Sequence, residues 1–220
     1  MSILKIYGHP LSRTFRNLWL VEELGIPYEN IPVAPGPTGS RLPEFLAINP
    51  NGRVPAIDDD GLVLWESLAI NFYLAKKHGG PLQPSGIVGE ALGLKWSYWA
   101  VNEVERPIGL WAKHALVLPE AECQADVRDS AFGELKAPLA VLDKALEAQV
   151  WLAEPDRFTV ADLNVAAILY RALWADLKQF PRVDKWLRSV WERPAARKIR
   201  ALRGDLKPEG PLYADSPAPL

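Results

Sequence analysis

The sequence has few of the residues that hold metals or staple small secreted domains. Its 220 residues include one Cys, Cys123, and three His. A single Cys excludes an intramolecular disulfide framework, and the two counts together leave little for a Cys/His metal site. We therefore expect a fold held by its apolar core and a function that needs no metal.

Long apolar runs and an excess of one charge are missing as well. No run approaches the 18 residues of a membrane-spanning helix, and the N-terminus lacks a signal peptide's apolar stretch. Lys and Arg total 25 against 27 Asp and Glu, which disfavours a broad basic surface for nucleic acid. Residues 182–207 carry nine bases and three acids, which we interpret as a solvated helical face, with a nucleic-acid patch as the alternative. We expect a cytoplasmic protein with neither a membrane nor a nucleic acid as partner.

The chain divides into two regions whose sequence patterns differ. Residues 1–79 mix short β-like runs with Pro, Gly and two helical patterns, whereas residues 89–203 are mostly long helical patterns. The helix breakers are dense at 80–88, where we place a linker. Residues 204–220 have little periodicity and predict an extended tail.

The first region predicts a small mixed sheet. A β-α-β unit needs a right-handed crossover and gives a parallel pair, while Asp60-Gly61 between two apolar runs is typical of an antiparallel hairpin. Gly25 and Gly79 supply the stops of the two helices. The expected elements are strands at 3–7, 28–33, 56–58 and 62–65 and helices at 12–24 and 67–78, the last N-capped by Ser67.

The second region predicts an all-helical domain. Pro107 should bend the first helix. Thr159-Val160-Ala161-Asp162 before an apolar run resembles a capping box. The expected helices cover 90–118, 123–148, 163–173, 183–190 and 195–202, the last two finishing the bundle.

Three short segments follow the β-α-β start in a fixed order, at 40–46, 49–57 and 64–70. Each is weak alone, but their order and spacing together are specific. With them, residues 1–203 resemble a cytosolic glutathione transferase. Gly8-His9-Pro10-Leu11-Ser12 followed by Arg16 is most similar to serine-type members, such as the phi and theta classes and their bacterial relatives. The resemblance implies a thioredoxin-like domain followed by an all-helical domain, glutathione as co-substrate and a homodimer.

Ser12 lies where the first strand gives way to the first helix. A thiol near a helix N-terminus has a lowered pKa, and a hydroxyl that donates to the sulfur would stabilise the thiolate further. We therefore expect Ser12 to be the catalytic hydrogen-bond donor. Tyr7 and Thr14 are rival hydroxyls, and a plain cap of the first helix is the alternative.

Glu66-Ser67 begins the second helix of the first region. Helix N-termini with a free hydroxyl suit a carboxylate, and Glu66 beside it can pair with an ammonium. The resemblance implies that this dipeptide holds the γ-glutamyl end of glutathione. A plain N-cap with a solvated Glu is the alternative.

The segment before the hairpin carries the remaining peptide contacts. The resemblance implies a cis bond at Val54-Pro55, which would turn the backbone of Val54 toward the cysteinyl residue like an added strand. An ordinary trans Pro at a strand start is the alternative. By similarity, Arg41 and Arg53 fall near the glycyl carboxylate and the cysteinyl-glycine part, and each has a solvated surface Arg as its alternative. Ser40 departs from the phi pattern, which often has His there.

The expected reaction is attack of the glutathione thiolate on a soft electrophile. In this family the acceptor lies between the domains, but core packing is the favoured explanation for most of the Trp residues there. Ser12 in place of a Cys disfavours a thiol-transferase. A glutathione-dependent peroxidase or disulfide reductase, and a non-catalytic interaction protein of the same fold, stay open. The acceptor-site candidates are His9, Leu11, Trp99, Asn102, Glu103, Arg106, Trp111 and His114. Trp99, Glu103 and Arg106 recur at i, i+4 and i+7 of one helical face.

Overall fold

The computed structural model describes residues 3–204, which form two compact units. The sheet unit comprises the described chain up to Gln83 together with Arg193–Gly204, and the helical unit comprises Pro84–Glu192. The last helix therefore belongs with the sheet, contrary to the expectation that it finishes the bundle. The tail expected at 204–220 lies, apart from Gly204, outside the described residues.

The sheet has four short strands in the order β2-β1-β3-β4. β1 (Leu4–Tyr7) runs parallel to β2 (Tyr28–Ile31) and antiparallel to β3 (Ala56–Asp59), which forms a hairpin with β4 (Leu62–Trp65). The predicted mixed sheet is confirmed. It is built from one crossover unit and one hairpin, as in the thioredoxin-like half of the expected fold.

The hairpin turn shows why Asp60-Gly61 was a strong signal. Both residues have positive φ, at 56° and 90°. A two-residue turn of this kind matches the twist of the flanking strands. The Gly61 N–H also donates to Asp58 Oδ1 at 2.9 Å, which closes the turn locally.

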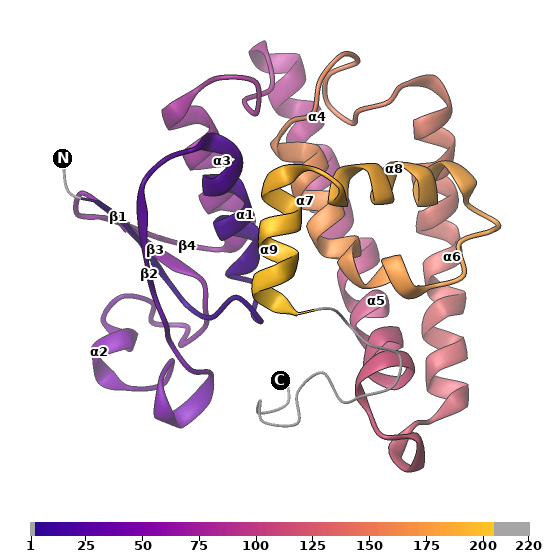
Figure 1. Ribbon diagram of the computed structural model, residues 1–220, viewed down its shortest axis with the longest axis horizontal. Helices are drawn as coiled ribbons and strands as arrows, with labels where there is room; N and C mark the ends of the chain where they lie inside the picture. Colours follow the sequence, from indigo (N-terminus) through magenta and orange to yellow (C-terminus); the bar gives the residue numbers. More distant parts are fainter. Residues whose placement is uncertain (1–2, 205–220) are drawn as a thin grey trace. The chain divides into compact units, whose positions relative to one another are not determined.

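Helices α1 (Phe15–Leu24) and α3 (Ser67–His78) lie side by side against one face of the sheet (Figure 1). Ile6 of β1, fully buried, belongs to the apolar core of this unit. α1 begins three residues later than expected because the chain from residue 10 to 13 turns, and it ends where Gly25 takes a left-handed conformation. The short helix α2 (Pro43–Leu46) falls inside the expected loop.

The last helix, α9 (Pro194–Arg203), packs along α1. Its buried face is short, with Ala196, Ile199 and Arg203 at spacings of three and four residues. Arg193, just before it, forms two hydrogen bonds with the Glu23 carboxylate, at 2.8 and 2.7 Å. This charge pairing and the buried face together hold the helix on the sheet unit.

The helical unit contains five α-helices in the described chain. The expected helix at 90–118 is interrupted by π-helical segments at Ala100–Val104 and Lys113–Val117. The first segment ends near Pro107, which has no N–H for a regular helical bond. Short 3₁₀-helices lie at Gly36–Thr38 of the sheet unit and at Glu120–Glu122 and Leu169–Trp174 of the helical unit. The α-helices are α4 (Gly86–Trp99), α5 (Glu105–Ala112), α6 (Ala125–Ala148), α7 (Val160–Ile168) and α8 (Pro181–Trp191).

Helix α7 is the buried centre of this unit, and its predicted capping box is confirmed. Every residue from Val160 to Ile168 is buried. The Asp162 carboxylate accepts from Thr159 N at 3.0 Å and from Leu152 N at 2.9 Å. Ala161 N donates to Thr159 Oγ1 at 3.3 Å. These bonds satisfy backbone groups that burial would otherwise leave unpaired.

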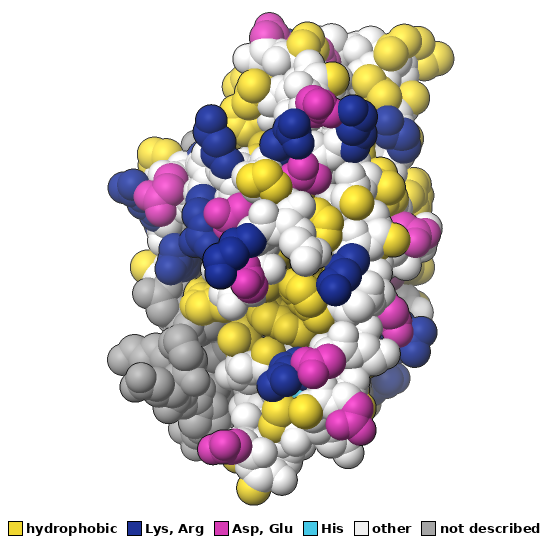
Figure 2. All heavy atoms as spheres, turned by 90° about the vertical axis from the view of Figure 1, so that its right-hand side faces the viewer, with side chains coloured by type: hydrophobic (Ala, Val, Ile, Leu, Met, Phe, Trp, Pro, Cys, Tyr) yellow, Lys and Arg dark blue, Asp and Glu magenta, His cyan; other side chains and the backbone are white. Residues whose placement is uncertain are grey.

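The basic stretch near the end of the chain is paired with acidic side chains. Arg182 forms an ion pair with Asp143 at 2.9 Å, and Arg188 with Asp184 at 2.9 Å. Figure 2 shows Lys and Arg interspersed with Asp and Glu around an apolar area on the face that α6 and α8 occupy. Within residues 3–204, no helix combines the length and apolar character needed to cross a membrane.

Candidate functional site

A tight turn links β1 to α1. Gly8 has φ of 131°, and a Cβ there would lie 2.0 Å from Thr14 Oγ1. Only a glycine leaves room for that hydroxyl. The turn is closed by Ser12 N donating to His9 O at 2.9 Å. The turn therefore presents Ser12 between the end of a strand and the start of a helix, as the sequence predicts.

The Ser12 hydroxyl stands in a small hydrogen-bond network. Its Oγ donates to His9 O at 2.7 Å, accepts from Thr14 N at 3.2 Å, and lies 2.8 Å from Thr14 Oγ1. Ser12 is half-buried and Thr14 is fully buried. The N-cap of α1 is Thr14 and no side chain caps this helix, so the reading of Ser12 as a plain cap is wrong.

The N-terminal turns of α1 and α3 are joined by buried side chains. Arg16 Nη1 donates to Ser67 Oγ at 3.2 Å, and Asn17 Nδ2 donates to Ser67 O at 2.8 Å. Asn17 Nδ2 also donates to Asn71 Oδ1 at 2.7 Å. Two helices thus begin at the same place, where their unsatisfied N–H groups and positive dipole ends favour an anion.

Ser67 is not the N-cap that the sequence predicts. It is the first residue of α3, Glu66 is the N-cap, and no side-chain cap bond forms. The Ser67 hydroxyl oxygen instead accepts from Arg16. Glu66 is exposed and has φ of 72°, a left-handed conformation that a non-glycine residue rarely adopts. Such an outlier is typical of a residue held for function.

Arg16 is the member of this cluster that sequence reasoning missed. It is buried in α1 although it carries a charge. The only signal for it was its place in the serine-type pattern. A buried guanidinium that donates to the hydroxyl of Ser67 fixes that side chain at the helix start.

The loop before β3 brings the two predicted arginines into one segment. The Val54-Pro55 bond is cis, as the resemblance implied. Gly52 has φ of 61°, and a Cβ there would lie 2.8 Å from Arg41 Cδ, so the Arg41 side chain lies over this glycine. Asn49 Nδ2 donates to Arg53 O at 2.6 Å and braces the loop. Both arginines are exposed.

Tyr7 and the two candidate acceptor residues of the turn also lie in the sheet unit. The Tyr7 ring is half-buried and meets Phe45 edge-on, with centroids 6.3 Å apart. His9 is exposed, and its Nδ1 accepts from Leu11 N at 3.2 Å. His9 and Leu11 therefore share one turn with Ser12.

The other acceptor candidates lie in the helical unit, among them the three that helical spacing grouped. Trp99 ends α4 and meets Trp96 edge-on at 5.1 Å. Glu103 lies in the π-helical segment and Arg106 at the start of α5, both exposed. The π-helical turn interrupts the regular spacing that grouped these residues on one face.

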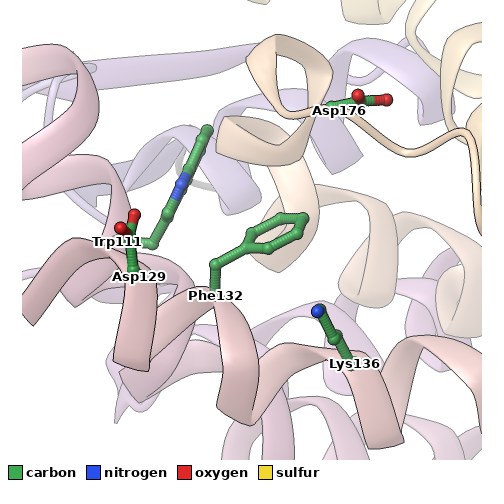
Figure 3. Close-up of a pocket in the computed structure, with 5 residues that line it drawn as sticks. All are labelled: Trp111, Asp129, Phe132, Lys136 and Asp176. Atoms are coloured by element: carbon green, nitrogen blue, oxygen red, sulfur yellow. The ribbon is translucent and has the colours of Figure 1, made fainter. Parts of the chain in front are cut away.

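A pocket of about 360 Å³ lies elsewhere in the helical unit (Figure 3). The rings of Trp111 and Phe132 project into it from α5 and α6, with centroids 6.0 Å apart. Of the acceptor-site candidates, Trp111 lines this pocket. In residues 3–204 there is also no group of three or more His, Cys, Asp and Glu side chains arranged to hold a metal ion. The lining residues are Trp111, Asp129, Phe132, Lys136 and Asp176.

Comparisons with known proteins agree with the fold. The family model described as glutathione S-transferase, N-terminal domain, matches residues 2–76, and its C-terminal counterpart matches residues 107–194. Glutathione S-transferase GstB of Escherichia coli strain K12 is 33% identical over 204 residues, covering 90% of this chain and 97% of that protein.

Solved structures show the same relationship. The theta class glutathione S-transferase from Xanthomonas axonopodis pv. citri, with glutathione bound, has a TM-score of 0.82 and 31% identity, covering 94% of this chain and 100% of the other. Glutathione S-transferase I from maize, in complex with an atrazine glutathione conjugate, has a TM-score of 0.81 and 29% identity, covering 91% and 98%. The chain belongs to the glutathione S-transferase family of enzymes.

Proposed function

We propose that the sheet unit binds glutathione and that the enzyme adds its thiolate to a soft electrophilic small molecule. The observation that carries this proposal is the meeting of the α1 and α3 N-termini through Arg16 and Ser67, next to the turn that presents Ser12. Two positive helix ends and a hydroxyl suit a ligand that offers carboxylates and a thiol. The glutathione-bound relative from Xanthomonas supports this ligand.

Ser12 is the donor to the sulfur in this proposal, which makes the enzyme a serine-type transferase. Thr14 has no exposed surface, so its hydroxyl can act only through Ser12. The ring of Tyr7, the other rival hydroxyl, packs edge-on against Phe45. Because Thr14 N–H donates to Ser12 Oγ, the Ser12 proton is left for an acceptor. In the ligand-free chain that acceptor is His9 O, and the thiolate replaces it.

Glu66 and Ser67 hold the γ-glutamyl end. The exposed Glu66 carboxylate pairs with the ammonium, and the Ser67 hydroxyl and the N–H groups of the first turn of α3 receive the carboxylate. Arg16 holds the Ser67 hydroxyl oxygen, so the Ser67 proton points to the ligand.

The loop from Arg41 to Pro55 holds the rest of the peptide. The Val54 backbone pairs with the cysteinyl residue in the manner of an added strand, next to the cis bond to Pro55. Arg41 and Arg53, both exposed, receive the glycyl carboxylate and the adjacent peptide group.

The acceptor is an electrophile with an aryl or alkyl carbon that the sulfur attacks. The maize relative, whose structure holds an atrazine glutathione conjugate, supports an aryl acceptor. We propose His9 and Leu11 as acceptor contacts from the turn. The proposed contacts from the helical unit are Trp99, Glu103 and Arg106.

The enzyme is proposed to be a homodimer. Apolar side chains are exposed on β4, including Val63 at 42% and Trp65 at 42%, and on α4, including Tyr98 at 64%. Exposed apolar groups gathered on single elements are typical of interfaces. Trp65→Asp should shift sedimentation from dimer to monomer, whereas Leu202→Asp, at a similarly exposed site on α9, should leave it unchanged. A wild-type monomer would contradict the proposal.

The function is tested with glutathione and 1-chloro-2,4-dinitrobenzene. We expect conjugation by the wild-type enzyme and a loss of about 10- to 100-fold in kcat for Ser12→Ala, the worth of one charge-assisted hydrogen bond. Ser130→Ala, at an exposed site on α6, is the matched control. Retention on glutathione resin without turnover would indicate a non-catalytic protein. Turnover of a peroxide without conjugation would indicate a peroxidase.

A further inference from the structure

Helix α9 runs antiparallel along α1 and is anchored at three levels. Arg193, before its first turn, pairs with Glu23 near the end of α1 at 2.7 Å. Lys198, near its middle, pairs with Glu22 at 2.7 Å. Its last residue, Arg203, reaches the opposite end of α1, where the guanidinium lies 4.1 Å from the ring centroid of Phe15. The final anchor therefore stands at the turn that carries Ser12.

Arg203 contacts the backbone of that turn directly. Its Nη1 donates to Pro10 O at 2.6 Å and lies 3.5 Å from Ser12 O. The residue is buried, with 7% of its surface exposed. A guanidinium is planar and always charged, so it can donate to carbonyl oxygens while stacking on an aromatic face. The short distance to Pro10 O is typical of a charge-assisted bond.

We propose that Arg203 is a positioning residue for Ser12, clamping the β1–α1 turn through the carbonyls of Pro10 and Ser12 so that the hydroxyl is aimed at the glutathione sulfur. This inference rests on the proposed role of Ser12. The turn lies outside the helices and strands, and Arg203 adds a donor from another element to its local hydrogen bonds. A donor that is misplaced by a fraction of an ångström loses much of its effect on a developing or resident charge.

The clamp is expected to affect the thiolate, through Ser12, and not the residues that hold the γ-glutamyl end of the peptide. The groups proposed to hold the γ-glutamyl end, Glu66 and Ser67, lie at the start of α3, whereas Arg203 donates to the carbonyls of the β1–α1 turn. The other charged groups of the turn and of the first turn of α1 are His9, Arg13 and Arg16. They are unchanged in an Arg203 variant. Arg203→Met also removes a positive charge, whereas Arg203→Lys keeps it, so a shift in the thiol pKa of the Lys variant reports the position of Ser12.

The test compares Arg203→Met and Arg203→Lys with Lys198→Met, which removes the middle anchor of the same helix. The measurements are the ultraviolet titration of the bound glutathione thiol, kcat and KM for conjugation, and the thermal midpoint. For Arg203→Met we expect the pKa of the bound glutathione thiol to rise by about one unit. At a pH below that pKa, the variant then holds about tenfold less thiolate than the wild type. We also expect a parallel fall in kcat and a KM for glutathione within about twofold.

Arg203→Lys keeps the charge but cannot span two carbonyls and a ring face, so we expect a rise of about half a unit. Lys198→Met should lower the thermal midpoint without moving the thiol pKa. If Arg203→Met does not fold, Arg203→Lys decides. If the wild-type enzyme binds glutathione as a thiolate and both Arg203 variants leave the pKa of the bound thiol unshifted, this inference alone is overturned. A wild-type enzyme that binds no thiolate overturns the proposed function and this inference with it.

Discussion

Thr14→Val isolates the hydrogen bond behind the proposed catalytic hydroxyl. Valine matches threonine in shape, and the Thr14 N–H still donates to Ser12 Oγ after the change. What is lost is the contact of Thr14 Oγ1 with Ser12 Oγ at 2.8 Å. Thr14 has no exposed surface, so the substitution changes nothing that a ligand touches directly.

The size of the effect follows from cooperativity between hydrogen bonds. A bond from Ser12 to a thiolate is worth about 2 kcal/mol, and each supporting bond strengthens it by about 10–30%. Loss of the supporting bond therefore removes about 0.2–0.6 kcal/mol, which raises the pKa of the bound thiol by about 0.2–0.4 units. Ser12→Ala should raise it by about 1.5 units by the same conversion.

The assay is the ultraviolet absorbance of glutathione thiolate bound to each variant, recorded against pH. Thr14→Ser restores the hydroxyl and is the control that should return the wild-type curve. A shift for Thr14→Val as large as that for Ser12→Ala would refute the reasoning, because it would make Thr14 the direct donor. A shift of zero would refute the supporting role.

Three further predictions concern the anchors of the fold and of the ligand. Arg16→Met should raise the KM for glutathione about 5- to 30-fold with little change in kcat, because Ser67 loses a charged donor at 3.2 Å; a fall in kcat at constant KM would contradict this role. Asp162→Ala should lower the free energy of unfolding in urea by about 3–5 kcal/mol, because two buried N–H groups lose their acceptor; a loss below about 1 kcal/mol would show that the capping box matters little. Burial alone would raise the pKa of Asp59, but hydrogen bonding, from Lys77 first, outweighs it and holds the pKa below its usual 3.8. The ionised Asp59 therefore stabilises the fold above pH 3.8, and this stabilisation is lost as pH falls through the lower pKa of the folded protein. Asp59→Asn should make the free energy of unfolding less dependent on pH in the acid range. Equal pH dependence in variant and wild type would refute the pairing.

Elements with local signals were predictable from the sequence. Gly25 ends α1 in the left-handed conformation that glycine tolerates, and Asp60-Gly61 closes the hairpin in the same way. Thr159 and Asp162 form their capping box within three residues of each other. In each case the residues that specify the structure are neighbours in the chain, so their spacing carries the information.

Features that depend on distant residues were missed or misplaced. Arg16 donates to Ser67 across 51 positions, and no local pattern predicts this contact. The basic face of α9 predicted only a solvated helix, because its partners lie on α1, about 170 positions earlier. Periodicity reports which side of a helix is apolar, but it does not report which element will cover that side.

The central claim is that Ser12 faces an anionic sulfur. The most direct measurement is a crystal structure of this enzyme with glutathione bound. We predict the sulfur within about 3.2 Å of Ser12 Oγ, the usual reach of a hydrogen bond, with the γ-glutamyl carboxylate at Ser67. A sulfur bound instead to the Tyr7 hydroxyl, or a peptide seated away from the start of α3, would contradict the account.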